Sequence, residues 1–209
     1  KGLYSGGTLA AEAGMLISEA LNLEGLVKQE GYILHSHGYD VIDLGDDIYT
    51  QGKPHPMIDP EVRIKKIEDY AQDEQTGVIL FDVVLGYGAH TDMVGALLPA
   101  IEAAQQTAQA ADRALYFVAT VCGTEKDPQN YQEAVNRLKA AGVYVAPSNA
   151  QAVQLALALK GATPSDADKT VNDYTGSKVE VPTVSEKVLQ LLTTKPRTTN
   201  VGLQRSHAS

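Results

Sequence analysis

Residues 77–85 constrain the fold of this chain most strongly, because they form an almost continuous apolar run. A strand of this composition is typical of a parallel sheet whose two faces are both covered by helices. Asp82 is the exception within the run, and a buried carboxylate requires a partner. The run therefore predicts a central parallel strand, with helices elsewhere in the chain that cover it.

Strand and helix patterns alternate along the chain up to about residue 160. We expect strands at 2–4, 40–44, 77–85, 114–121 and 143–145, and helices at 8–21, 61–72, 91–111, 128–141 and 148–159. Asp59 and Pro60 form an N-cap and first helical position for the helix at 61–72, whose charged face we expect to be solvated. This alternation predicts an α/β fold, a flavodoxin-like doubly wound parallel sheet of about five strands with helices on both faces.

The pattern stops after Lys160. Residues 161–209 are rich in polar residues, and we expect an irregular extension or linker in which residues 184–192 are compatible with one short helix. Since the sequence opens on Lys1, we expect it to be part of a longer polypeptide.

Composition excludes several classes of function. The net charge of −9 argues against binding to nucleic acid or to an anionic membrane surface. No apolar run approaches the ~20 residues that cross a membrane. Cys122 is the single cysteine and cannot form an internal disulfide, so we expect a cytoplasmic protein.

Two predicted strands end at glycine-containing turns that lead toward helices. Backbone N–H groups and the helix dipole at such a turn favour an anion, and ligands of open α/β sheets lie outside the carboxyl ends of the strands. Glycine is also common at tight corners, so either turn alone fits a purely structural role. The pair predicts a site for phosphate or a phosphorylated small molecule. Its candidate residues are Ser5, Gly6, Gly7 and Thr8 (the first glycine turn), Gly86, Tyr87, Gly88 and Ala89 (the second glycine turn), and Gly123 and Thr124 after the next strand.

His90 follows the second glycine turn and is the candidate catalytic residue. It is placed to donate to a phosphate oxygen or to act as an acid or base near neutral pH, and the alternative is that it caps the next helix. His55 lies between two prolines in a loop that we expect to reach the carboxyl edge of the sheet, as a binding element or as a rigid connection.

Other polar residues are less informative. His35-Ser36-His37 reads as surface or edge structure, because a metal site would need further ligands, and no metal is predicted. Asp43, Asp46 and Asp47 follow a strand, where they could meet a substrate or magnesium or simply form a turn. Cys122 reads as a small buried residue rather than a nucleophile.

Five stretches together resemble the FdrA family. They are Gly2-Leu-Tyr-Ser-Gly-Gly-Thr-Leu9, Asp43-Leu-Gly-Asp-Asp47, Gly52-Lys-Pro-His-Pro-Met-Ile-Asp-Pro60, Val83-Val-Leu-Gly-Tyr-Gly-Ala-His90 and Val121-Cys-Gly-Thr-Glu-Lys-Asp-Pro128. That family resembles the CoA-ligase domains of succinyl-CoA synthetase and the NDP-forming acyl-CoA synthetases. The resemblance implies that residues 1–160 form a CoA-ligase-like domain.

In those synthetases two helix N-termini from similar domains face each other across a phosphate site, and a mobile histidine carries the phosphoryl group. Residues 86–89 resemble the turn before one such helix. The histidine lies in a Gly-His-Ala-Gly loop after the fourth strand, and residues 122–128 hold no counterpart. In this respect the chain resembles the non-phosphorylated beta-type subunit.

The resemblance implies a predicted acyl-CoA synthetase-like protein of FdrA type without the phosphohistidine loop. CoA, ATP with Mg, or carbamoyl phosphate would then bind together with other segments, and no cofactor is expected in this stretch alone. One alternative is a component of an oxamate carbamoyltransferase that uses carbamoyl phosphate in allantoin and purine degradation. Another is a non-catalytic partner domain of a CoA-binding complex. We expect a homo-oligomer or a hetero-complex with related subunits.

Overall fold

The computed structural model describes residues 1–23 and 29–161. The predicted extension and its helix at 184–192 lie outside these residues. The described elements are β1 (Gly2–Tyr4), α1 (Gly7–Leu21), β2 (Tyr32–Ser36), β3 (Tyr39–Asp43), α2 (Asp47–Thr50), α3 (Glu61–Gln72), β4 (Val78–Val84), α4 (Met93–Ala110), β5 (Tyr116–Cys122), α5 (Tyr131–Ala140), β6 (Tyr144–Ala146) and α6 (Asn149–Leu159).

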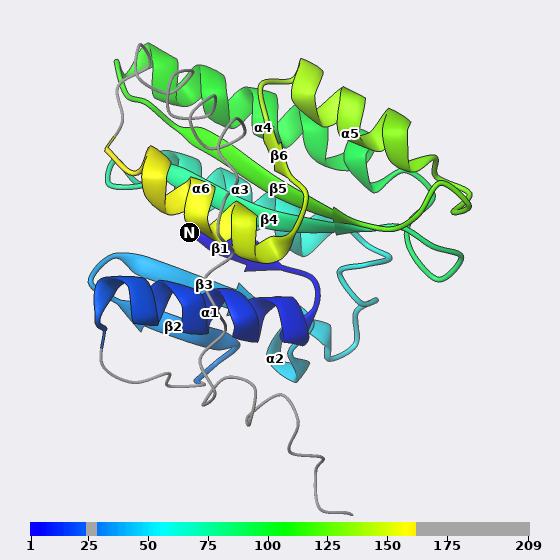
Figure 1. Cartoon of the computed structure of the whole chain (residues 1–209), viewed down its shortest axis with the longest axis horizontal. Coiled ribbons are helices and arrows are strands. Elements are labelled where there is room, and N and C mark those ends of the chain that lie inside the picture. The colour runs from blue at the N-terminus through cyan, green and yellow to red at the C-terminus, as the bar shows by residue number, and fades with distance from the viewer. Residues whose placement is uncertain (24–28, 162–209) are drawn as a thin grey trace, which may run out of the picture. The chain divides into compact units, whose positions relative to one another are not determined.

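The strands form one sheet in the order β2-β3-β1-β4-β5-β6 (Figure 1). All neighbouring strands are parallel except β2, which runs antiparallel to β3. Without β2, the order of the parallel strands is that of flavodoxin, with the chain reversing direction across the sheet between β1 and β4. The prediction of a flavodoxin-like doubly wound sheet is confirmed.

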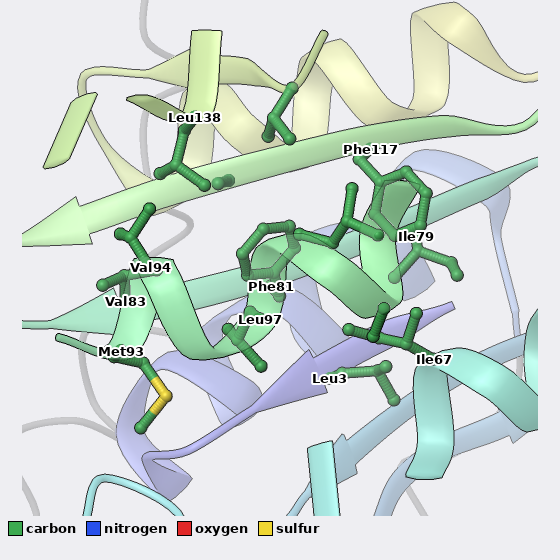
Figure 2. Close-up of a cluster of buried hydrophobic side chains, with 14 of the residues drawn as sticks. Leu3, Ile67, Ile79, Phe81, Val83, Met93, Val94, Leu97, Phe117 and Leu138 are labelled. Carbon is green, nitrogen blue, oxygen red and sulfur yellow. The ribbon is translucent and has the colours of Figure 1, made fainter. Parts of the chain in front are cut away.

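Helices cover both faces of the sheet. One core lies under α3, α4 and α5, and includes Ile79, Phe81 and Val83 of β4. Figure 2 shows these three side chains pointing into one cluster with Ile67 and Leu97. The other core lies under α1 and α6 and includes Leu80. The alternation along β4 explains its continuous apolar run, since successive side chains enter opposite cores.

The sheet has one strand more than predicted. The additional strand is β2, which was missed because its sequence mixes polar and apolar residues. It joins β3 through His37 and Gly38, whose φ values of 50° and 84° are those of a tight hairpin turn that matches the twist of the strands. The interpretation of His35-Ser36-His37 as edge structure is confirmed, because β2 is an edge strand.

Two helices begin later than predicted, and a third begins as predicted at Glu61 but has a different N-cap. The helix expected at 128–141 begins only at Tyr131, because Asn130, at φ 55°, caps it by accepting the Glu133 N–H. The helix expected at 91–111 begins at Met93 after its cap Asp92. Asp59 accepts the Glu61 N–H as a cap would, but Pro60 is the residue that immediately precedes α3.

Candidate functional site

The first glycine turn leads directly from β1 into α1. Ser5 is fully buried, Gly6 is half-buried, and Gly7 and Thr8 are exposed. The N-cap residue Gly6 has φ −125° and ψ 129° and provides no side chain to cap the helix, and the first turn of α1 contains no acidic residue. The N-cap residue therefore provides no acceptor for the first backbone N–H groups of α1, which leaves them for another acceptor such as an anion.

Asp43 explains why residue 7 is glycine. A Cβ at Gly7 would lie 2.7 Å from Asp43 Oδ2, so only a residue without a side chain lets the carboxylate approach the end of the helix. Asp43 is buried, and its Oδ1 accepts the Gly45 N–H at 2.9 Å. A carboxylate near a helix N-terminus is favourable because of the helix dipole.

His55 approaches the same region from the loop that follows β3. Its Nε2 lies 2.6 Å from the point where a Gly45 Cβ would be, and the Ser5 carbonyl oxygen lies 2.9 Å from that point. The ring Nδ1 accepts the Met57 N–H at 3.1 Å, so the neutral ring carries its proton on Nε2. The expectation that this loop reaches the carboxyl edge of the sheet is confirmed.

The same loop connects the two glycine turns. The His90 N–H, just after the second turn, donates to the Met57 carbonyl oxygen at 2.8 Å. Residues that follow β1, β3 and β4 are thereby brought together at one edge. We call this region the carboxyl-edge site; it consists of the two glycine turns, Asp43, Gly45, His55 and His90.

The second glycine turn is held by a glutamine and lacks an open helix end. Gln129 accepts the Gly86 N–H at 2.9 Å and donates to the carbonyl oxygens of Gly86 (2.6 Å) and His90 (3.2 Å). Tyr87 and Gly88 are exposed, and Ala89 is half-buried. Because the Gly86 N–H is already bound, this turn has fewer donors for an anion than its sequence indicates.

The N-terminus of α4 differs from that of α1 because it is capped by a carboxylate. Asp92 Oδ1 accepts the Gly95 N–H at 2.9 Å and forms an ion pair with Arg137 at 2.8 Å. The hydrogen bond from Arg137 lowers the pKa of Asp92. A carboxylate lies near both helix ends, Asp43 at α1 and Asp92 at α4, but only α4 has an N-cap side chain that accepts a helix N–H, so α1 keeps more donors for an anion.

His90 uses one ring nitrogen within the turn itself. Its Nδ1 accepts the Asp92 N–H at 2.9 Å, and the side chain is half-buried. This contact matches the alternative expected from the sequence, in which His90 caps the start of the next helix. Nε2 is the nitrogen that remains for contact with a ligand, and the catalytic role of His90 stays a prediction.

Gly123 and Thr124 have local structural roles in the loop after β5. A Cβ at Gly123 would lie 2.7 Å from the Leu85 Cβ, so glycine is required there by packing. The Thr124 N–H and Oγ1 donate to Asp127 Oδ2 at 2.6 and 3.2 Å. The Thr124 N–H is thus committed to Asp127 and not to an anion.

A buried ion pair lies beneath the first glycine turn. Asp82 accepts the Ser5 N–H (2.8 Å) on Oδ1 and the Ser5 hydroxyl (2.7 Å) on Oδ2. Arg63 Nη2 donates to Asp82 Oδ1 at 3.1 Å and to the main-chain oxygen of Asp82. Asp82 and Arg63 are 0% and 1% exposed. The requirement of Asp82 for a partner is confirmed.

The expectation of a solvated charged face on the helix at 61–72 was wrong for Arg63. Arg63, Ile67 and Ala71 are all buried and are spaced four residues apart, which places them on one side of α3. That spacing was the available signal, because it puts the arginine in line with two core residues.

Asp40 lies at the opposite edge of the sheet, where it accepts hydrogen bonds from three side chains. The donors are Lys1 Nζ (2.9 Å), His35 Nδ1 (2.6 Å) and the Tyr70 hydroxyl (3.0 Å). Burial alone would raise the pKa of Asp40, but these hydrogen bonds outweigh burial and lower it. The cluster is a structural anchor for β3.

Two remaining candidates are also structural. Within residues 1–23 and 29–161 no group of His, Cys, Asp or Glu side chains is arranged to hold a metal, and Asp46 caps α2 by accepting the Ile48 N–H. Cys122 is half-buried, and burial, followed by the charges of Asp82 and Glu12, raises the pKa of its thiol. A raised pKa makes a thiol a poor nucleophile.

The fold is a doubly wound α/β domain, and the carboxyl-edge site lies where the chain reverses direction across the sheet. The family model for CoA-ligase matches residues 3–159, and the chain belongs to the CoA-ligase family. It is an acyl-CoA synthetase-like domain. The uncharacterized protein YahF of Escherichia coli (strain K12) is 36% identical over 155 residues, which cover 71% of this chain and 30% of YahF. In the described part of the chain, no helix is both long enough and apolar enough to span a membrane.

Proposed function

We propose that this acyl-CoA synthetase-like domain is of the FdrA type and binds the phosphate group of a phosphorylated substrate at the N-terminus of α1. The observation that supports this proposal is the open start of α1, where Gly7 and Thr8 are exposed and Gly6 supplies no capping side chain. Unpaired N–H groups and the helix dipole attract an oxyanion there. The turn follows β1, one of the two strands between which ligands of doubly wound sheets bind.

In this proposal, the domain holds a phosphoryl group that other segments or subunits deliver. Residues 122–130 contain no histidine, and their Thr124 and Asp127 bond to each other. A phosphohistidine step on this loop is therefore not part of the proposal. CoA, and ATP with Mg, would bind together with other segments, and His90 Nε2 would act at the edge of the phosphate.

A second candidate is a component of an oxamate carbamoyltransferase. Transfer from carbamoyl phosphate needs donors for one phosphate group and no phosphohistidine, and the open end of α1 fits that need. Activity of the complete complex with carbamoyl phosphate and oxamate supports this candidate, whereas activity with ATP, CoA and an acid supports the synthetase. Phosphate binding without either activity would favour a non-catalytic partner domain.

The anion site is tested by placing a carboxylate where we expect phosphate. A Cβ at Gly6 has no atom within 4 Å, and the backbone already has the extended conformation of an N-cap. Gly6→Asp is expected to cap α1 and raise the melting temperature, yet to weaken binding of inorganic phosphate by at least about tenfold. Binding is measured by NMR titration of the 209-residue chain, in which the amide signals of residues 6–8 should shift.

Gly88→Asp is the matched control, because a Cβ at Gly88 also has no atom within 4 Å. It adds the same charge to the second glycine turn, two residues from His90, and is expected to weaken phosphate binding clearly less than Gly6→Asp does. Undiminished binding by Gly6→Asp would refute the proposed site. Loss of binding by Gly88→Asp alone would move the site to the second turn.

We also propose that a related subunit or a second copy of this chain covers the carboxyl edge. Among the described residues, the exposed large hydrophobic side chains are Ile48, Ile58 and Tyr87, which are 51%, 51% and 91% exposed. All three follow the carboxyl ends of β3 or β4. Ile58→Glu is expected to shift the chain or its complex toward monomer in sedimentation experiments. Gln106→Glu, in the last two turns of α4, is the control and should leave association unchanged. An unaltered chain that stays monomeric both alone and in the presence of related subunits would contradict this proposal.

A further inference from the structure

Two strands separate directly beneath the proposed phosphate site. β1 pairs with β4 only at Gly2–Leu80 and Leu3–Phe81, whereas β4 continues to pair with β5 as far as Cys122. The ladder between β1 and β4 thus ends just before Asp82. The Ser5 N–H bonds to the Asp82 side chain at this point, so the carboxylate extends the connection between the two strands after the ladder has ended.

Ser5 is held by both of its donors. Asp82 accepts its N–H at 2.8 Å and its hydroxyl at 2.7 Å, and the residue is fully buried. The next residue is Gly6, the N-cap of α1. Because glycine at residues 6 and 7 does not restrict the backbone by itself, the direction of the first N–H groups of α1 depends on how firmly Ser5 is fixed.

Arg63 provides the balancing charge. A lone Asp82 carboxylate behind the turn would add to the negative charge that Asp43 already places beside Gly7, and would further repel a phosphate in front of the turn. Arg63 donates to both Asp82 Oδ1 and the Asp82 main-chain oxygen, and it is as deeply buried as the aspartate. A buried ion pair is weak evidence for net stability, and the contacts of this pair with Ser5 and with the Asp82 main chain favour a role in fixing geometry.

We propose that Ser5, Asp82 and Arg63 are positioning residues of the phosphate site: Asp82 fixes the first glycine turn through Ser5, and Arg63 neutralises Asp82 so that an anion is accepted in front of it. This inference rests on the proposed phosphate site at α1. None of the three side chains needs to touch the ligand, because each acts through the backbone of the turn or through its charge.

The first test separates positioning from stability. Ser5→Ala removes the hydroxyl contact and is expected to weaken inorganic phosphate binding by about fivefold in the NMR titration of the 209-residue chain. Ser5→Thr keeps the hydroxyl and is expected to retain affinity, even if its extra methyl group lowers the melting temperature. Ser18→Ala is the matched control, because the buried Ser18 Oγ has no hydrogen-bond partner within the described residues; its affinity should be unchanged.

The second test concerns the charge. Arg63→Met is expected to weaken phosphate binding by more than Ser5→Ala does, and the double change Arg63→Met with Asp82→Asn is expected to regain part of that loss. If Arg63→Met does not fold, the Ser5 variants still decide the inference. Equal affinity of the unaltered chain and Ser5→Ala, or an affinity that follows the melting temperature in all variants, overturns this inference alone. Absence of phosphate binding by the unaltered chain overturns the proposed function as well.

Discussion

Replacement of Arg63 by methionine should destabilise the domain far more than an ordinary loss of a charged residue. The change keeps a long side chain beside Phe81 but leaves Asp82, which is 0% exposed, with its charge unbalanced. Removing one member of a buried ion pair costs about 3–5 kcal/mol. For a chain of this size, that cost corresponds to a fall of about 6–20 °C in melting temperature.

The measurement is thermal and urea unfolding of the 209-residue chain, followed by circular dichroism. Lys65→Met on the same helix is the control, because the Lys65–Asp69 pair is also an ion pair but its side chains are 68% and 50% exposed. An exposed pair is screened by solvent and is expected to contribute little to stability. The double variant Arg63→Met with Asp82→Asn removes both charges and should recover more than half of the lost stability.

Two results would refute the reasoning. One is an Arg63→Met variant whose free energy of unfolding lies within about 1 kcal/mol of that of the unaltered chain. The other is a double variant that is less stable than Arg63→Met. Either result would mean that the charge of Asp82 does not depend on Arg63 for its stabilisation, contrary to what the burial of both side chains indicates.

Three further outcomes are expected. Gly7→Ala should cost about 1–3 kcal/mol in unfolding experiments, since its Cβ would lie 2.7 Å from Asp43, whereas Gly88→Ala has open space and should stay within about 0.5 kcal/mol; equal costs would contradict this. Asp40→Asn should be less stable than the unaltered chain at neutral pH. Because folding lowers the pKa of Asp40, this difference in stability should shrink as the pH falls below about 4. A stability difference that grows on acidification would contradict this prediction. Cys122 should react with a thiol reagent more slowly in the folded chain than in urea, because burial raises its pKa, and equal rates would show that it is not protected.

The fold could be predicted because its signals are local. Residues 77–85 carry an apolar run that is typical of a strand covered by helices on both faces. Strand patterns and helix patterns alternate along the rest of the chain up to about residue 160. The edge strand β2 was missed because a strand with one free edge needs no continuous apolar pattern. The first glycine turn could be placed at the carboxyl edge, since all parallel strands end at the same side of a sheet.

The details of the site depend on contacts that no local pattern encodes. Gln129 binds Gly86 across 43 residues of sequence, and Arg63 binds Asp82 across 19. The sequence shows two similar glycine turns, whereas the structure shows one open helix end at α1 and one at α4 that is capped by Asp92 and paired with Arg137.

The sequence by itself therefore determined which segments become strands and helices, and at which edge their glycine turns meet. Only the tertiary structure decided which turn keeps its N–H groups available and which buried charges hold it. The physical reason is that periodicity and glycine placement act within a few residues, while hydrogen bonds and ion pairs form between side chains that only the packing of α3, α5 and the loop at residues 52–60 brings together.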